Sequence, residues 1–270
     1  MIKFPNCKIN LGLHITGKRD DGYHNLETVF YPVPLTDALE ILPQSHFEFT
    51  TSGLAIQGDP AKNLCVKAYD LLKTDFDLPP VHMHLHKAIP MGAGLGGGSS
   101  NGAFALLIFN ELFDLCLQQQ QLIDYALQLG SDCPFFVVNT PCFAFGRGEM
   151  LEPFTLSLSG YQLVLANPGI HVSTAWAFSQ IVPSPASAHL AEIVQQPVSQ
   201  WKGQLCNDFE EPVCKSYPLV KELIDYFYAQ GAHYAAMTGS GSTVFGLLPP
   251  ELSASPPPAL NLALYKVLAL

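Results

Sequence analysis

Hydrophobic and polar positions alternate in the first segment of the chain. The odd-numbered residues from Ile9 to Ile15 are aliphatic, whereas the even-numbered residues from Lys8 to His14 are polar or glycine. This period of two is typical of a β-strand with two different faces. A turn-rich stretch follows at 16–22, and a second extended run goes from His24 to about Leu35. The pattern predicts a long β-hairpin with polar groups near its tip.

The remaining pattern predicts a mixture of strands and helices. Apolar residues repeat at helical spacing after Asn63, a suitable cap. The expected strands are 38–42, 46–57, 81–88, 161–166, 243–248 and 260–268, and the expected later helices are 101–115, 119–129, 173–181 and 207–230. Pro183–Pro185 and Pro256–Pro258 are expected to be surface loops. We predict an α+β fold with two lobes, formed by domains 1–152 and 153–270.

Composition and charge narrow the possible functions. The chain has 270 residues, of which 48% are hydrophobic, so it can bury a substantial core and is not wholly disordered. Its net charge of −10, with only Arg19 and Arg147 as arginines, argues against a nucleic-acid partner. We find no apolar run of membrane-spanning length and no signal peptide, and the seven scattered cysteines are typical of reduced thiols. We therefore expect a cytoplasmic protein.

The most informative segment is PMGAGLGGGSS at 90–100. Its five glycines stand between a predicted strand and a predicted helix, whose first N–H groups are unsatisfied and whose dipole attracts anions. The pattern predicts a phosphate-binding loop, because a flexible linker would not usually place five glycines directly against a helix. A side chain at Gly97 is expected to keep phosphate away from the backbone N–H groups.

Other phosphate-binding motifs do not fit this loop. Gly92, Gly94 and Gly97 have the spacing of the dinucleotide fingerprint, but the acidic residue at the required distance, Glu111, falls within the continuing helix. A Walker A loop requires a lysine before its final Ser or Thr, and the segment has none. The protein-kinase signatures H-R-D and D-F-G are also absent from the sequence.

Taken with KIN at 8–10 and MTGSGSTVFG at 237–246, the loop resembles the GHMP kinase superfamily. Within it, the chain resembles the 4-diphosphocytidyl-2-C-methyl-D-erythritol kinases, through KINLGL at 8–13, DGYH at 21–24, LGSDCPFF at 129–136, NDFE at 207–210 and the triple glycine at 96–98. The resemblance implies a two-lobed fold with an N-terminal ribosomal-protein-S5-domain-2-like lobe and a C-terminal ferredoxin-like lobe. It also implies a kinase of the non-mevalonate isoprenoid pathway, which uses ATP and Mg²⁺ to phosphorylate the 2-hydroxyl of its substrate.

The resemblance assigns catalytic roles to Asp132 and Lys8. Local sequence alone favours Asp132 as a helix cap, because it stands two residues before Pro134, and it favours Lys8 as a surface lysine. In the family the matching aspartate is catalytic, and the matching lysine contacts it and the substrate hydroxyl. An ammonium group within about 4 Å would keep the carboxylate ionised and stabilise developing charge.

The resemblance also assigns the binding residues, although DGYH alone could be a hairpin tip and 239–243 a turn. For ATP they are Pro90, Met91, Gly92, Ala93, Gly94, Leu95, Gly96, Gly97, Gly98, Ser99 and Ser100. For 4-diphosphocytidyl-2-C-methyl-D-erythritol they are Asn10, Tyr23, His24, Phe30, Thr174, Phe178 and Gly239. We assign no protein metal ligand, and whether Mg²⁺ contacts Ser99, Ser100 or only the phosphates stays open. We expect no nucleic-acid or membrane partner, and a monomer or weak dimer. The alternatives are a homoserine or mevalonate type of GHMP kinase, or a non-catalytic nucleotide sensor.

Three further features have their own interpretations. Arg147 could pair with a carboxylate or approach a phosphate, and both remain open. Residues 207–210 have the spacing of a helix cap with a reciprocal carboxylate, which favours a structural role. His82, His84 and His86 share one strand face but spread over about 13 Å, too far for a single zinc ion. A solvated strand face is therefore expected there.

Overall fold

The chain forms two compact units that do not follow the sequence as contiguous halves. The computed structural model describes residues 1–184, 190–252, 254–257 and 260–270. The first unit contains Met1–Lys8, Pro32–Met91 and Gly96–Thr140, and the second contains Ile9–Tyr31, Gly92–Leu95 and Pro141–Leu270. The predicted boundary between 152 and 153 divides the sequence differently from this division by contacts, and it stays a prediction.

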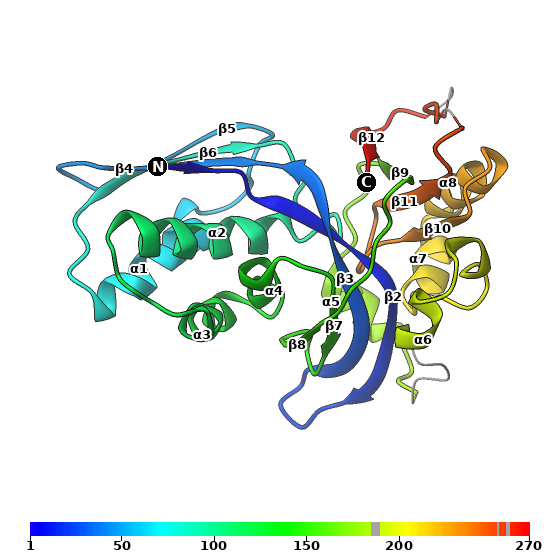
Figure 1. The fold of residues 1–270 in the computed structure, drawn as a ribbon, viewed down its shortest axis with the longest axis horizontal. Helices are drawn as coiled ribbons and strands as arrows, with labels where there is room; N and C mark the ends of the chain where they lie inside the picture. Colours follow the sequence, from blue (N-terminus) through cyan, green and yellow to red (C-terminus); the bar gives the residue numbers. More distant parts are fainter. Residues whose placement is uncertain (185–189, 253, 258–259) are drawn as a thin grey trace. The chain divides into compact units, whose positions relative to one another are not determined.

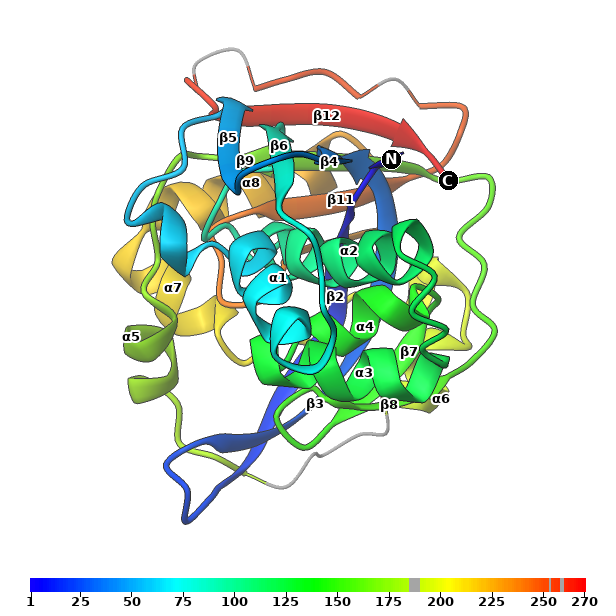
Figure 2. The ribbon, with the colours of Figure 1, turned by 90° about the vertical axis from the view of Figure 1, so that its left-hand side faces the viewer.

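The first unit has a mixed four-stranded sheet with helices on one face (Figure 1). The strand order is β1 (Ile2–Lys3), β4 (Ala38–Pro43), β6 (Val81–Lys87) and β5 (Glu48–Gly53), and only the β5–β6 pair of this sheet is parallel. Against it lie α1 (Leu64–Asp75) and α2 (Gly97–Leu112), and beyond them α3 (Gln119–Leu129) and α4 (Cys133–Val138) (Figure 2). A short 3-10 turn, Pro60–Lys62, precedes α1. The Asn63 side chain accepts from the Cys65 N–H and caps α1, as predicted.

A second sheet contains the predicted hairpin. Its order is β2 (Asn6–Lys18), β3 (His24–Thr36), β7 (Cys142–Phe145) and β8 (Met150–Pro153). The alternation in the sequence correctly identified the two long strands. However, all residues from Cys7 to Leu13 are buried, so the polar face of β2 is covered as well as the aliphatic one. Both long strands pass from one compact unit into the other.

The second unit has an antiparallel sheet with the order β10 (Tyr234–Met237), β11 (Val244–Leu248), β9 (Gln162–Asn167) and β12 (Leu264–Ala269). Helix α8 (Pro218–Ala229) packs on β10 and β11. The remaining helices of this unit are α5 (Thr174–Ser179), α6 (Leu190–Val194), the 3-10 turn Val198–Gln200 and α7 (Glu210–Ser216). Leu13 and Ile15 of β2 join the core that Phe209 and Phe227 form with this sheet.

The structure confirms the α+β class and corrects several boundaries. The single helix expected at 207–230 is two helices, because Pro218 disfavours a helical conformation at Tyr217, whose φ and ψ are −133° and 78°. Helix α2 begins at Gly97 and not at 101, so its first turn contains two glycines of the loop. Pro185 and Pro258, in the two predicted proline-rich loops, lie outside the described residues. Among the residues described, no helix is both long and apolar enough to cross a membrane.

Candidate active site

The start of α2 has open backbone donors. Gly96 occupies the N-cap position with φ +69°, and it supplies no side-chain cap for the N–H groups of the first turn. An added Cβ at Gly96 would lie 3.2 Å from Cε of Lys8 and 3.0 Å from Cζ of Phe136. Glycine is therefore required here both for the left-handed backbone and for the close approach of the lysine. The result is an uncapped helix start directly beside Lys8.

The next two glycines have different surroundings. An added Cβ at Gly97 would lie 2.9 Å from Cγ2 of Ile89 and 3.0 Å from Nζ of Lys87, inside the unit. Gly97 thus allows α2 to pack against the end of β6, and the expectation that a side chain here would also keep phosphate away from the backbone stays a prediction. At Gly98 the nearest atom to an added Cβ is Cε of Met91, at 3.5 Å. Gly98 is the less crowded of the two positions.

A buried carboxylate connects the end of β6 to α2. Asp37 accepts hydrogen bonds from the backbone N–H groups of Ala88 (2.7 Å) and Ile89 (2.8 Å) and from Nδ2 of Asn101 (2.8 Å). It also pairs with Nζ of Lys87, and both side chains are fully buried. Burial lowers the pKa of Lys87, whereas the charge of Asp37 acts in the opposite direction. Asp37 therefore fixes both the strand end and the beginning of the helix.

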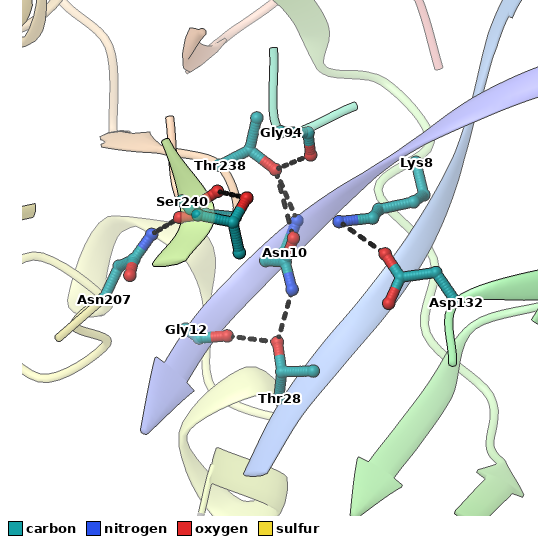
Figure 3. Close-up of polar contacts among 11 residues, drawn as sticks. Lys8, Asn10, Gly12, Thr28, Gly94, Asp132, Asn207, Thr238 and Ser240 are labelled. Carbon is teal, nitrogen blue, oxygen red and sulfur yellow. Dashed lines mark hydrogen bonds and ion pairs between the residues drawn. The ribbon is translucent and has the colours of Figure 1, made fainter. Parts of the chain in front are cut away.

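Lys8 and Asp132 form an ion pair beside this helix start. Nζ of Lys8 lies 3.6 Å from Oδ2 of Asp132 (Figure 3). The lysine side chain is only 4% exposed, so it is not a surface lysine, whereas Asp132 is 37% exposed. Burial lowers the pKa of Lys8, and the charge of Asp132 opposes that shift. Asp132 occupies the N-cap position of α4 but makes no capping hydrogen bond, so the cap interpretation does not hold.

Two further contacts relate α4 to the first turn of α2. The thiol of Cys133, the residue after Asp132, hydrogen-bonds to the side chain of Ser99, and burial raises the pKa of this thiol to about 12. The Oγ of Ser100 is buried and has no hydrogen-bond partner among the described residues. A buried hydroxyl of this kind is usually satisfied by a partner. Because Ser100 lies in the first turn of α2, a ligand bound at this helix start, either an anion or a cation, would supply the missing partner.

In the second unit, Asn10 lies at the centre of a hydrogen-bond network (Figure 3). Its backbone N–H donates to Oγ1 of Thr238 (2.9 Å), and its Nδ2 donates to Oγ1 of Thr28 (2.9 Å). The Thr238 hydroxyl also lies 3.3 Å from the carbonyl oxygen of Gly94. An added Cβ at Gly94 would be 2.0 Å from the Thr238 carbonyl oxygen, which explains the glycine. This network holds residues 92–95 of the glycine loop against residues 238–241.

Aromatic side chains gather near the tip of the β2–β3 hairpin. The rings of His24 and Phe178 are stacked with centroids 4.8 Å apart, and Tyr23 is 54% exposed. Phe30 is only 2% exposed and lies opposite Cys142 of β7, a position that suits packing better than ligand contact. Elsewhere in this unit, the hydroxyl of Thr174 lies 3.1 Å from that of Ser240, next to Gly239. The structure thus brings two of the rings expected at the base, His24 and Phe178, into direct contact.

Residues 207–210 connect several segments of the second unit. Nδ2 of Asn207 donates to the carbonyl oxygens of Met237 (2.8 Å) and Gly239 (2.9 Å), and the carboxylate of Glu210 accepts from the Met237 N–H. Asp208 accepts from the Ile15 N–H at 2.7 Å. The structural interpretation of this motif therefore holds, although its side chains bridge strands and do not form the expected reciprocal cap.

The three strand histidines form hydrogen bonds with hydroxyl groups of the neighbouring strand. Thr50 lies between His82 (2.9 Å) and His84 (2.8 Å), and Ser52 lies between His84 (2.9 Å) and His86 (3.0 Å). The residues come from β6 and its parallel partner β5. These bonds account for the alternating histidines as part of the sheet surface.

Comparison with known proteins identifies the family. The model of the GHMP kinases N terminal domain matches residues 63–140, and that of the GHMP kinases C terminal domain matches residues 192–255. A protein of Bacteroides fragilis named 4-diphosphocytidyl-2-C-methyl-D-erythritol kinase is 56% identical over 255 residues, which are 93% of this chain and 93% of that protein. The chain belongs to the 4-diphosphocytidyl-2-C-methyl-D-erythritol kinase family.

Other members and solved structures agree with this assignment. A 4-diphosphocytidyl-2-C-methyl-D-erythritol kinase of Cytophaga hutchinsonii is 51% identical, with 92% of each chain covered. The crystal structure of a 4-(cytidine 5'-diphospho)-2C-methyl-D-erythritol kinase matches with a TM-score of 0.77 at 33% identity, over 92% of this chain and 90% of that one. The Methanococcus jannaschii mevalonate kinase matches with a TM-score of 0.68 at 15% identity, over 93% and 91%, which shows a shared fold. The predicted resemblance to the family is confirmed.

Nothing in the sequence singled out three residues that support this site: Asp37, Thr28 and Thr238. Asp37 gave no signal beyond a single charge between two predicted strands, and Thr28 and Thr238 lay in unremarkable positions of predicted strands or turns. Arg147, left open above, pairs with Glu149 at 3.4 Å and lies over the ring of Tyr23. Of its two interpretations, the structure contains the pairing with a carboxylate.

Proposed function

We propose that this protein is an ATP-dependent kinase that phosphorylates the 2-hydroxyl of 4-diphosphocytidyl-2-C-methyl-D-erythritol, a step of the non-mevalonate isoprenoid pathway. The names of the relatives at 56% and 51% identity support the substrate. The observation that carries the chemistry is the Lys8–Asp132 pair, which lies in one compact unit with the uncapped start of α2. A proton acceptor, a cation and an anion-binding helix start are the parts that phosphoryl transfer requires.

In the proposed reaction, Asp132 accepts the proton of the substrate hydroxyl. The hydroxyl oxygen then forms a bond to the γ-phosphorus of ATP, the bond from that phosphorus to the β,γ-bridging oxygen breaks, and ADP leaves. The partly exposed carboxylate of Asp132 can reach a bound hydroxyl, and the buried ammonium of Lys8 lies 3.6 Å from it. The same ammonium stabilises negative charge on the transferred group.

The glycine loop, residues 90–100, is proposed to bind ATP. The backbone N–H groups of Gly97, Gly98 and Ser99 belong to the first turn of α2 and have no acceptor within the helix, and the positive end of the helix dipole there favours phosphate. The Oγ of Ser100, which has no partner among the described residues, is a suitable oxygen ligand for the Mg²⁺ that accompanies ATP. Alternatively, its hydroxyl donates a hydrogen bond to a phosphate oxygen. When bound, Mg²⁺ neutralises part of the charge on the β- and γ-phosphates.

The cytidine part of the substrate is proposed to bind at the β2–β3 hairpin. Tyr23, His24 and Phe178 offer aromatic surface for stacking and a ring nitrogen for hydrogen bonding to the edge of the base. Asn10, Thr174 and Gly239 complete the proposed substrate-binding set, whereas Phe30, which is only 2% exposed, is left out of it. A base with a different pattern of hydrogen-bond donors and acceptors would leave buried polar groups of the site unpaired. The free energy that this costs gives the selectivity for cytosine.

We further infer a cytoplasmic enzyme that acts on small molecules as a monomer or weak dimer. All seven cysteines lie in the described part of the chain and are free thiols, as a reducing compartment favours. The net charge of −10 is unfavourable for binding nucleic acid.

The test is a comparison of acceptors with the purified protein. With ATP and Mg²⁺, we expect phosphorylation of 4-diphosphocytidyl-2-C-methyl-D-erythritol at a kcat/KM at least about 10²-fold above that for mevalonate or homoserine. Asp132→Asn should retain the Kd for ATP and lower kcat by at least about 10²-fold. Preferred use of mevalonate or homoserine would overturn the substrate, and ATP binding without transfer to any of the three would favour a nucleotide sensor.

A further inference from the structure

The ring of Tyr23 has two faces with different surroundings. The guanidinium carbon of Arg147 lies 4.9 Å from the ring centroid, over one face. The tyrosine is nevertheless 54% exposed, whereas the Arg147 side chain is only 28% exposed. A cation within about 6 Å of an aromatic face attracts the ring through its quadrupole. The Arg147 guanidinium thus covers one face of the Tyr23 ring, and the rest of the ring accounts for the exposed surface.

We propose that Arg147 is a positioning residue for the substrate base: it holds Tyr23 from behind, so that the other face of the ring is presented for stacking. The proposal rests on the proposed function, in which Tyr23 binds the cytidine part of the substrate. Arg147 does not itself contact the base. It fixes the ring that does, and this reduces the conformational freedom that an exposed tyrosine would lose on binding.

The arginine is held by Glu149, and the turn that carries the arginine is held by β3. Its Nε lies 3.4 Å from Oε1 of Glu149, and its backbone N–H donates to Oε2 of the same carboxylate at 2.5 Å. The preceding residue, Gly146, accepts a hydrogen bond from the Leu26 N–H of β3 at 2.7 Å. Gly146 has φ +67°, and an added Cβ would lie 2.9 Å from the Glu149 carboxylate. The turn between β7 and β8 is therefore fixed to β3, the hairpin strand that begins directly after Tyr23.

The tyrosine backbone is also held, by a different residue. The Tyr23 N–H donates to Oδ1 of Asp21 at 3.1 Å, and Asp21 pairs with Arg19. The hydrogen bond from Tyr23 is the main cause that lowers the pKa of Asp21, with smaller contributions from Arg19 and Arg147. Arg19 therefore helps to hold the tyrosine backbone through Asp21 and is not a neutral control. Lys18, the exposed last residue of β2, carries the same charge next to the hairpin tip and is the matched control for Arg147.

The experiment measures steady-state kinetics of the full chain with ATP and 4-diphosphocytidyl-2-C-methyl-D-erythritol. Arg147→Gln should raise the KM for the cytidine substrate roughly two- to fivefold, the usual scale of an exposed cation–π contact. The kcat and the KM for ATP should not change. Arg147→Lys keeps a cation and should recover part of the effect. Lys18→Gln, which removes an equal charge, should leave all three parameters within about 1.5-fold, well below the cation–π effect.

A double-mutant cycle separates positioning from direct contact. In the Tyr23→Ala background, Arg147→Gln should have no further effect on KM, because there is no ring left to hold. An undiminished effect in that background would show that Arg147 acts directly on the substrate, and this would overturn the proposal. An equal rise in KM for Lys18→Gln would show a general charge effect and would also overturn it.

Failure of the proposed function has a different signature. If the wild-type protein does not phosphorylate the cytidine substrate, or if Tyr23→Ala leaves its KM unchanged, the function or the site assigned to Tyr23 is wrong, whatever Arg147 does. If Tyr23→Ala raises this KM but Arg147→Gln does not, the function stands and the role of Arg147 is refuted. Circular dichroism of each variant, with an unchanged spectrum expected, shows that the hairpin remains folded.

Discussion

Replacement of Asp37 by asparagine should destabilise the protein more than any single change at its partner Lys87. The carboxylate has four donors around it: two backbone N–H groups, the amide of Asn101 and the ammonium of Lys87. An asparagine oxygen can still accept from the backbone. Its NH₂ group, however, is itself a donor and would face the two side-chain donors, Asn101 and Lys87. The buried Lys87 ammonium would then lose Asp37, its acceptor among the described residues.

The magnitude follows from the unpaired charge. Removing one member of a fully buried ion pair typically costs about 3–5 kcal/mol, because the other charge remains in a poorly solvating environment. Lys87→Met is different, since Asp37 would keep three hydrogen-bond donors. Its expected cost is about 1.5–3 kcal/mol, the scale of one hydrogen bond to a charged group. The asymmetry, and not the absolute values, is the prediction.

Thermal unfolding followed by calorimetry measures this asymmetry. For a chain of this size about 1 kcal/mol corresponds to roughly 2–4 °C, so Asp37→Asn should lower the Tm by about 6–20 °C and Lys87→Met by about half as much. Lys221→Met, which breaks an exposed pair with Asp225, is a control with little expected effect. If Lys87→Met costs as much as Asp37→Asn or more, the network is not centred on the carboxylate and the reasoning fails.

Three further predictions concern the proposed site. Lys8→Met should lower kcat by roughly 10²- to 10³-fold with an unchanged Kd for ATP by calorimetry, and a near-normal kcat would remove Lys8 from the reaction. Gly97→Val should cost about 1–3 kcal/mol of stability through its clash with the end of β6, whereas Gly98→Ala should keep or slightly raise the Tm, and equal Tm values would contradict the packing difference. His24→Ala should reduce the kcat/KM preference for cytidine over uridine analogues by roughly 10-fold, and an unchanged preference would place recognition of the base edge elsewhere.

Local pattern predicted the long hairpin and most helices, but it could not place the side chains that meet from distant segments. Alternation identified β2, yet nothing in its period showed that its polar face would also be covered and that Lys8 would be buried. The start of α2 was placed too late because glycine has a low helix propensity, and here the packing of Gly97 on Ile89 outweighs that preference.

The candidate site shows the same division. The Lys8–Asp132 pair was expected only through the family resemblance, because the two residues are far apart in sequence and each alone looked ordinary. Asp37 was missed for the same reason, since its donors come from segments 50 or more positions away. Such contacts depend on the tertiary fold, which single-sequence periodicity does not report.

The strand β2 passes from the first compact unit to the second between Lys8 and Ile9, and this has a consequence for inheritance and protein engineering. Residues 153–270 alone would lack Leu13 and Ile15, which belong to the core of the second unit. That fragment would expose an unfilled core and could not be exchanged as a module between relatives. Recombination that joins the first half of one family member to the second half of another must therefore preserve complementary side chains at the ends of the exchanged pieces.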